Sequence, residues 1–87
     1  MSLHKDEKAG IIKSFALHEG DTGSPEVQIA ILSKEIEKLG EHLKVHRKDN
    51  HSRRGLLQMV GNRRRMMEYL KTTDESRFKK VAKTLGL

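Results

Sequence analysis

Hydrophobic positions recur at helical intervals along most of this chain, and the pattern is clearest in residues 29–43. Apolar residues there step by three and four positions, which is the spacing of one face of an α-helix. Ser24 and Pro25 come just before, as an N-cap residue and a residue suited to the first helical position. Gly40 interrupts the stripe without ending it, so we predict a helix from Pro25 to near Val45.

Three further segments carry apolar faces. Residues 5–17 have a short stripe with acids in the first turn, and Thr73-Asp74 cap a final helix that Gly86 ends. A third helix begins between residues 49 and 52, runs to about Lys71, and has two adjoining apolar stripes, formed by Leu56, Leu57, Met59, Val60, Met66, Met67 and Leu70.

No segment alternates as a strand would, and the loops between the long helices are short. We therefore predict one all-α domain over residues 1–87 with a thin, aliphatic core. Its four helices include three that pack as an antiparallel bundle. The second and third form a hairpin, the last packs across it, and the N-terminal helix is loosely attached.

The distribution of charge indicates a class of partner, because the net charge of +6 lies entirely in residues 41–71. That segment holds nine Lys or Arg and three Asp or Glu, whereas the rest of the chain is balanced. A localised basic field is typical of proteins that bind nucleic acid. A charged face that only confers solubility is the alternative, and a DNA-compacting or regulatory helical protein would use the same segment.

Other classes of function find little support. The chain has no Cys, no apolar run of the roughly 20 residues that a membrane span needs, and no secretory signal, so we expect a cytoplasmic protein. It has no phosphate-binding loop and no paired carboxylates, so we expect no enzyme and no cofactor. His42, His46 and His51 could approach a zinc ion, but the surrounding cations would repel it, so we expect no metal site.

The basic stretch KVHRKDNHSRRG contains one acid, Asp49. A carboxylate there either caps the third helix or accepts a hydrogen bond from the N2 amino group of guanine in the shallow minor groove of RNA, and both roles stay open. Further on, residues 63–65 are consecutive arginines that fan across roughly 200° of a helix. At least one should reach a phosphate, while another can pack its stem along the apolar seam.

Three stretches, GDTGSPEVQIAIL, EHLKVHRKDNHSRRGLLQMVGNRRRMMEYL and KTLGL, resemble the family of the bacterial small-subunit ribosomal protein numbered fifteen. The resemblance covers essentially the whole chain. It implies a four-helix structural protein of the cytoplasmic ribosome, a monomer when free, that binds small-subunit rRNA early in assembly. The RNA targets that the resemblance implies are a three-way junction and a nearby purine-rich motif of the central domain. Implied partners are neighbouring small-subunit proteins, large-subunit rRNA at an intersubunit bridge and, in some members, the protein's own mRNA, whose translation they repress.

The resemblance also implies roles for individual residues. The positions that match junction contacts are Thr22, Gly23, Gln28, Arg65 and Tyr69. Those that match a trio in the minor groove are His42, Asp49 and Ser52, and the candidates for phosphate contacts are Lys48, Arg53, Arg54 and Arg64. The chain departs from the family at Pro25, commonly Thr, and at Asn50, often His, which bears on affinity rather than on the target.

Overall fold

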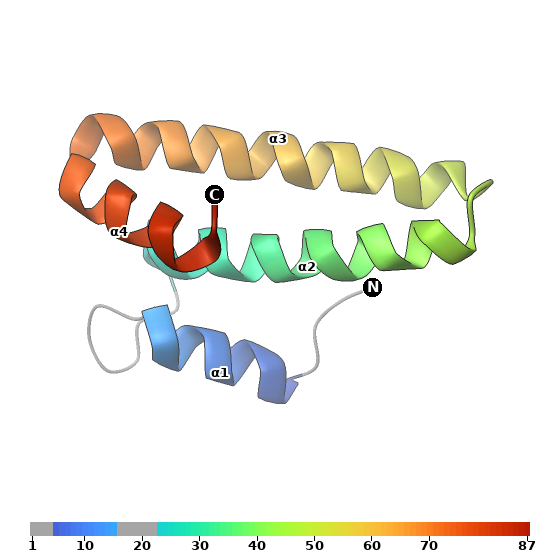
Figure 1. Ribbon diagram of the computed structural model, residues 1–87, viewed down its shortest axis with the longest axis horizontal. Coiled ribbons are helices and arrows are strands. Elements are labelled where there is room, and N and C mark those ends of the chain that lie inside the picture. Colours follow the sequence, from blue (N-terminus) through green and yellow to red (C-terminus); the bar gives the residue numbers. More distant parts are fainter. Residues whose placement is uncertain (1–4, 16–22) are drawn as a thin grey trace.

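A computed structural model describes residues 5–15 and 23–87, and the part it describes is built from four α-helices with no strand. In chain order these are α1 (Lys5–Phe15), α2 (Pro25–Val45), α3 (Asn50–Thr73) and α4 (Glu75–Leu85). Helices α2 and α3 form a long antiparallel hairpin, and α4 folds back from the end of α3 to pack against both (Figure 1). The predicted all-α fold with a three-helix bundle is therefore confirmed.

Side chains cap the beginnings of the three bundle helices. The Ser24 hydroxyl accepts a hydrogen bond from the backbone N–H of Val27 at 3.4 Å, and Pro25 is the first residue of α2. Asp74 joins α3 to α4, since its N–H donates to the carbonyl of Leu70 at 2.8 Å while its carboxylate accepts from the first turn of α4. Helix α3 thereby runs two residues beyond its predicted end at Lys71. Gly86 ends α4 with a φ of 72°, as its position predicted.

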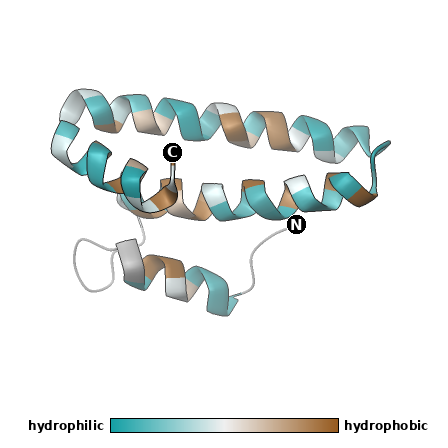
Figure 2. Ribbon diagram, viewed as in Figure 1, coloured by the Kyte–Doolittle hydropathy of each residue, from teal (hydrophilic) through white to brown (hydrophobic). Residues whose placement is uncertain are grey.

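A core cluster joins one buried residue from each bundle helix, namely Ile29, Leu70 and Val81. Met66, Met67, Phe78 and Leu85 pack around them. The expected thin, aliphatic core is therefore present, and Figure 2 shows a mainly hydrophilic α3 with short hydrophobic segments. Leu57, on the apolar stripes of α3, is 68% exposed, so not every residue of these stripes enters the core.

Helix α1 lies along α2, and within the described residues its backbone approaches no other helix (Figure 1). Ile11 and Ile12 are half-buried, and the Lys38 ammonium pairs with the Glu7 carboxylate at 2.5 Å. Residues 16 and 17 of the predicted first helix lie outside the described residues. The arrangement is that of an appendage, while its loose attachment stays a prediction.

A partly buried ion pair ties the beginning of α2 to the beginning of α4. The guanidinium of Arg77 donates two hydrogen bonds to the carboxylate of Glu26, at 2.5 and 2.6 Å. The side chain of Glu26 is only 5% exposed. This geometry is the bidentate arrangement that a guanidinium and a carboxylate favour, and it holds the end of the bundle closed.

Candidate nucleic-acid interface

The turn between α2 and α3 is built around Asp49. Helix α2 ends as the N–H of His46 donates to the carbonyl of His42 at 2.9 Å. Helix α3 then begins as Asp49 Oδ1 accepts from the backbone N–H of Ser52 at 3.0 Å. Asp49 is therefore the N-cap of α3, which was one of the two roles left open by the sequence.

The same carboxylate gathers the three residues of the predicted trio. Asp49 Oδ2 accepts the hydroxyl of Ser52 at 2.6 Å and lies 2.9 Å from His42 Nε2. All three side chains are half-buried. These hydrogen bonds, first the Ser52 hydroxyl, then the Ser52 N–H and then His42, hold the pKa of Asp49 well below its usual range. The turn thus presents a preassembled cluster whose carboxylate is ionised at neutral pH.

The donors and acceptors of this cluster are fixed by chemistry. A carboxylate can only accept, so the Ser52 hydroxyl points its proton at Asp49 and keeps its own lone pairs. Nε2 of His42 must donate its hydrogen to this carboxylate as well, and in the neutral form of the ring Nδ1 is then an acceptor. With the unused lone pair of Asp49 Oδ1, the trio therefore offers hydrogen-bond acceptors to a partner.

The cations that neighbour the trio in the sequence have different roles. Arg53 donates from Nη2 to the carbonyl of Arg47 at 2.6 Å, so it braces the turn as well as contributing charge. Lys48 and Arg54 are exposed. A shallow depression beside them is lined by His42, Val45, His46, Arg47, Lys48 and Asp49. Among the described residues, no three His, Cys, Asp or Glu side chains gather as metal ligands would.

The three consecutive arginines of α3 divide between structure and surface. Arg63 is half-buried and donates from Nη1 to the hydroxyl of Ser33 in α2 at 3.3 Å. Arg64 and Arg65 are exposed. One member of the triplet therefore packs against the neighbouring helix, as the sequence allowed, while the phosphate contact expected of another stays a prediction.

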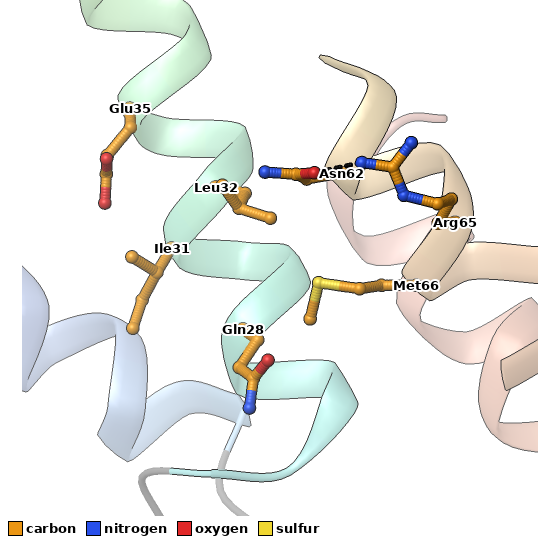
Figure 3. Close-up of a pocket in the computed structure, with 7 residues that line it drawn as sticks. All are labelled: Gln28, Ile31, Leu32, Glu35, Asn62, Arg65 and Met66. Atoms are coloured by element: carbon orange, nitrogen blue, oxygen red, sulfur yellow. Dashed lines mark hydrogen bonds between the residues drawn. The ribbon is translucent and has the colours of Figure 1, made fainter. Parts of the chain in front are cut away.

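A second group of predicted contacts lies toward the other end of the hairpin. Gln28 donates from Nε2 to the carbonyl of the exposed Gly23 at 2.8 Å. Gln28 and Arg65 line one groove between α2 and α3 (Figure 3). Tyr69, one helical turn beyond Arg65, is 60% exposed. Thr22 lies outside the described residues.

The structure thus separates the predicted site residues into two clusters. Gln28 and His42 are two heptads apart on one side of α2, which corresponds to about 21 Å along the helix. The groove also contains Glu35 and Asn62, which sequence reasoning missed. The seven-residue spacing of Gln28, Glu35 and His42 was the signal that could have pointed to Glu35.

Comparison with known proteins agrees with these features. The model of the family described as Ribosomal protein S15 matches residues 8–87. The small ribosomal subunit protein uS15 of Chloroflexus aggregans is 56% identical over 87 residues, which cover all of this chain and 98% of that protein. None of the described helices is long and apolar enough to cross a bilayer. The chain belongs to the ribosomal protein S15 family.

Proposed function

We propose that this chain is a structural constituent of the small ribosomal subunit and binds its rRNA at two features of the central domain early in assembly. Membership of the family supports the first part. The observation that carries the second is the hydrogen-bonded trio of His42, Asp49 and Ser52 within a basic turn. Acceptors set among cations suit a target that offers both donors and negative charge.

The acceptors would recognise the minor groove of folded RNA. That groove is wide and shallow and presents 2′-hydroxyl groups together with the N2 amino group of guanine. Both are donors that Asp49, Ser52 Oγ and His42 Nδ1 can receive, whereas phosphate oxygens have no proton to give. The trio therefore selects a groove edge over a phosphate, and its preassembly reduces the ordering that binding requires.

The cations would hold the RNA backbone. Lys48 and Arg54 are exposed and near the trio in the sequence, and Arg64 is exposed on α3, so each can neutralise a phosphate. At the second cluster, the exposed ring of Tyr69 can stack on a base, and Arg65 and Gln28 can contact the junction. Two clusters about 20 Å apart on a rigid hairpin suit two neighbouring RNA features.

Further roles rest on the family alone. These are contacts with neighbouring small-subunit proteins, a contribution to an intersubunit bridge with large-subunit rRNA, and repression of the protein's own mRNA. They stay predictions for this chain.

Equilibrium binding to three nucleic acids tests the proposal. The probes are a three-way junction fragment of central-domain rRNA, a plain RNA duplex and a DNA duplex of equal length, each at physiological salt. We expect the junction to bind at least about tenfold more tightly than either duplex, because base-edge contacts add to the shared electrostatic term. Equal affinity for all three would refute the ribosomal function, and preference for the DNA duplex would favour a DNA-compacting protein.

A further inference from the structure

The groove between α2 and α3 has an apolar floor and a polar rim. Ile31, Leu32 and Met66 are half-buried along it. Its polar residues are Gln28 and Glu35 from α2 with Asn62 and Arg65 from α3 (Figure 3). Glu35 lies midway between Gln28 and His42 at seven-residue intervals, so it occupies the same side of α2, with a drift of about 20° per heptad. The groove is thus continuous with the predicted RNA contacts.

The orientation of Asn62 follows from its partner. Its Oδ1 accepts a hydrogen bond from Arg65 Nη2, and a guanidinium has no acceptor, so the oxygen must face Arg65. The amide nitrogen then remains as a donor, and Figure 3 shows it directed toward α2. A methyl group at Gly61 would lie 3.7 Å from Arg65 Nη1, so the guanidinium lies back along α3 beside Gly61 and Asn62.

The other two polar residues of the groove, Gln28 and Glu35, both offer acceptors. Gln28 uses its amide nitrogen on the carbonyl of Gly23, which leaves Oε1 as an acceptor. Glu35 is half-buried, and among the residues that the structure describes no hydrogen bond or ion pair holds its carboxylate. A carboxylate beside an apolar surface is stabilised by a partner that donates hydrogen bonds to it.

An unstacked guanine complements this arrangement. Its N1–H and N2 amino group are adjacent donors that one carboxylate can receive together, and its O6 accepts from an amide nitrogen. Its flat faces suit an apolar floor, and its phosphate suits Arg65. RNA-binding proteins commonly read splayed bases along this edge. Adenine offers no such pair of adjacent donors.

We propose that this groove receives an unstacked guanine nucleotide of the bound RNA. Glu35 accepts from the N1–H and N2 amino group, Asn62 donates to O6 and steadies Arg65, and Arg65 holds the phosphate. The inference rests on the proposed function, because it requires an RNA partner, and it adds Glu35 and Asn62 as determinants of specificity.

Glu35→Gln tests the inference, because a purely electrostatic role and a base contact predict opposite changes in RNA affinity. Removing a negative charge from a basic RNA-binding face should strengthen binding to every RNA if only electrostatics matter. Loss of the carboxylate from a base contact should instead weaken binding to the junction RNA, by about 5- to 100-fold. Glu37→Gln is the matched control, since it removes the same charge from an exposed position of the same helix. Thermal melting of each variant establishes that the bundle is intact.

A chemical probe identifies the base. Kethoxal reacts with N1 and N2 of unpaired guanine, so wild-type protein and the Glu37→Gln variant should protect one unpaired guanine of the junction RNA. The Glu35→Gln variant should leave that guanine reactive. Asn62→Asp keeps an oxygen for Arg65 but removes the donor, and it should also weaken junction binding.

The outcomes separate this inference from the broader function. If wild-type protein prefers the junction and Glu35→Gln binds it as tightly as Glu37→Gln does, the groove does not hold a guanine and the ribosomal function is untouched. If wild-type protein shows no preference for the junction, the proposed function itself fails. Protection of a guanine that persists in Glu35→Gln would also overturn the inference.

Discussion

The ion pair between α2 and α4 is buried on one side only, which predicts unequal losses of stability when one or the other partner is removed. Arg77→Ala leaves the Glu26 carboxylate, whose side chain is 5% exposed, without two charge-assisted hydrogen bonds. Glu26→Gln leaves a guanidinium that is 36% exposed and can turn into water, and the amide oxygen still accepts one bond. The arginine variant should therefore be the more destabilised of the two.

The magnitudes follow from burial. Removing one partner of a fully buried pair costs about 3–5 kcal/mol. Because the Arg77 side of this pair reaches solvent, we expect about 2–3 kcal/mol for Arg77→Ala and about 1 kcal/mol for Glu26→Gln. In a bundle of this size, each 1 kcal/mol lowers Tm by about 4–8 °C.

Urea unfolding followed by far-UV circular dichroism measures these differences. The control is Lys79→Ala, which removes another cation of α4 from an exposed pair with Glu75, 3.4 Å apart. Such pairs contribute about 0–1 kcal/mol. If Arg77→Ala were no more destabilised than Lys79→Ala, the pair would not hold α4 onto α2. If Glu26→Gln were the worse variant, the argument from unequal burial would be refuted.

Three further predictions concern other parts of the bundle. Gly40→Ala should stabilise the protein by about 0.5–1 kcal/mol in urea unfolding, because Gly40 is inside α2 and an added methyl would meet nothing within 4 Å; destabilisation would show an unseen contact. Asp49 should contribute stability that is complete above its ordinary pKa of 3.8 and is lost as pH falls toward its lowered folded-state pKa. The free energy of unfolding should therefore fall less steeply with decreasing pH in Asp49→Ala than in the wild-type protein. Identical pH dependence in the two proteins would contradict this. Finally, α1 amides should exchange hydrogen faster than α2 amides, and faster still in Lys38→Ala, which loses the contact with Glu7; slow exchange in α1 would refute its loose attachment.

Local chemistry made the helices and their ends predictable from the sequence. Ser24, Asp49, Asp74 and Gly86 all act at the ends where the sequence placed a cap or a stop, since capping depends on neighbours within three or four residues. The spacing of apolar residues likewise located the core residues Ile29 and Leu70, although it did not show that α2 leaves Leu57 uncovered.

Contacts between helices could not be predicted from local sequence patterns. Glu26 and Arg77 are 51 residues apart, and nothing in their local sequence indicates that the ends of α2 and α4 meet. The groove that joins Glu35 to Asn62 depends on the rotation of α2 against α3. The bracing of the turn by Arg53 also needed the backbone in place, because sequence alone shows a cation and not the carbonyl it reaches.

The trio was predictable only in part. Asp49 was conspicuous as the one acid within a basic run. The sequence did not decide whether it caps the third helix or contacts an RNA base. The structure adds that one carboxylate caps α3 through Oδ1 and gathers His42 and Ser52 through Oδ2. Capping and base recognition are therefore compatible, since Oδ1 keeps a lone pair for RNA.

The most direct test of the central claim compares wild-type protein with Asp49→Asn on the junction RNA and on a plain RNA duplex across a range of salt. Asn is nearly as good an N-cap as Asp and keeps an oxygen for the N–H of Ser52, so the fold should persist. We expect affinity for the junction to fall about 5- to 100-fold while duplex affinity is unchanged or higher, because a base contact is lost and a negative charge removed. Unchanged junction affinity, or an equal loss on both RNAs, would contradict the claim that this acid selects the RNA site.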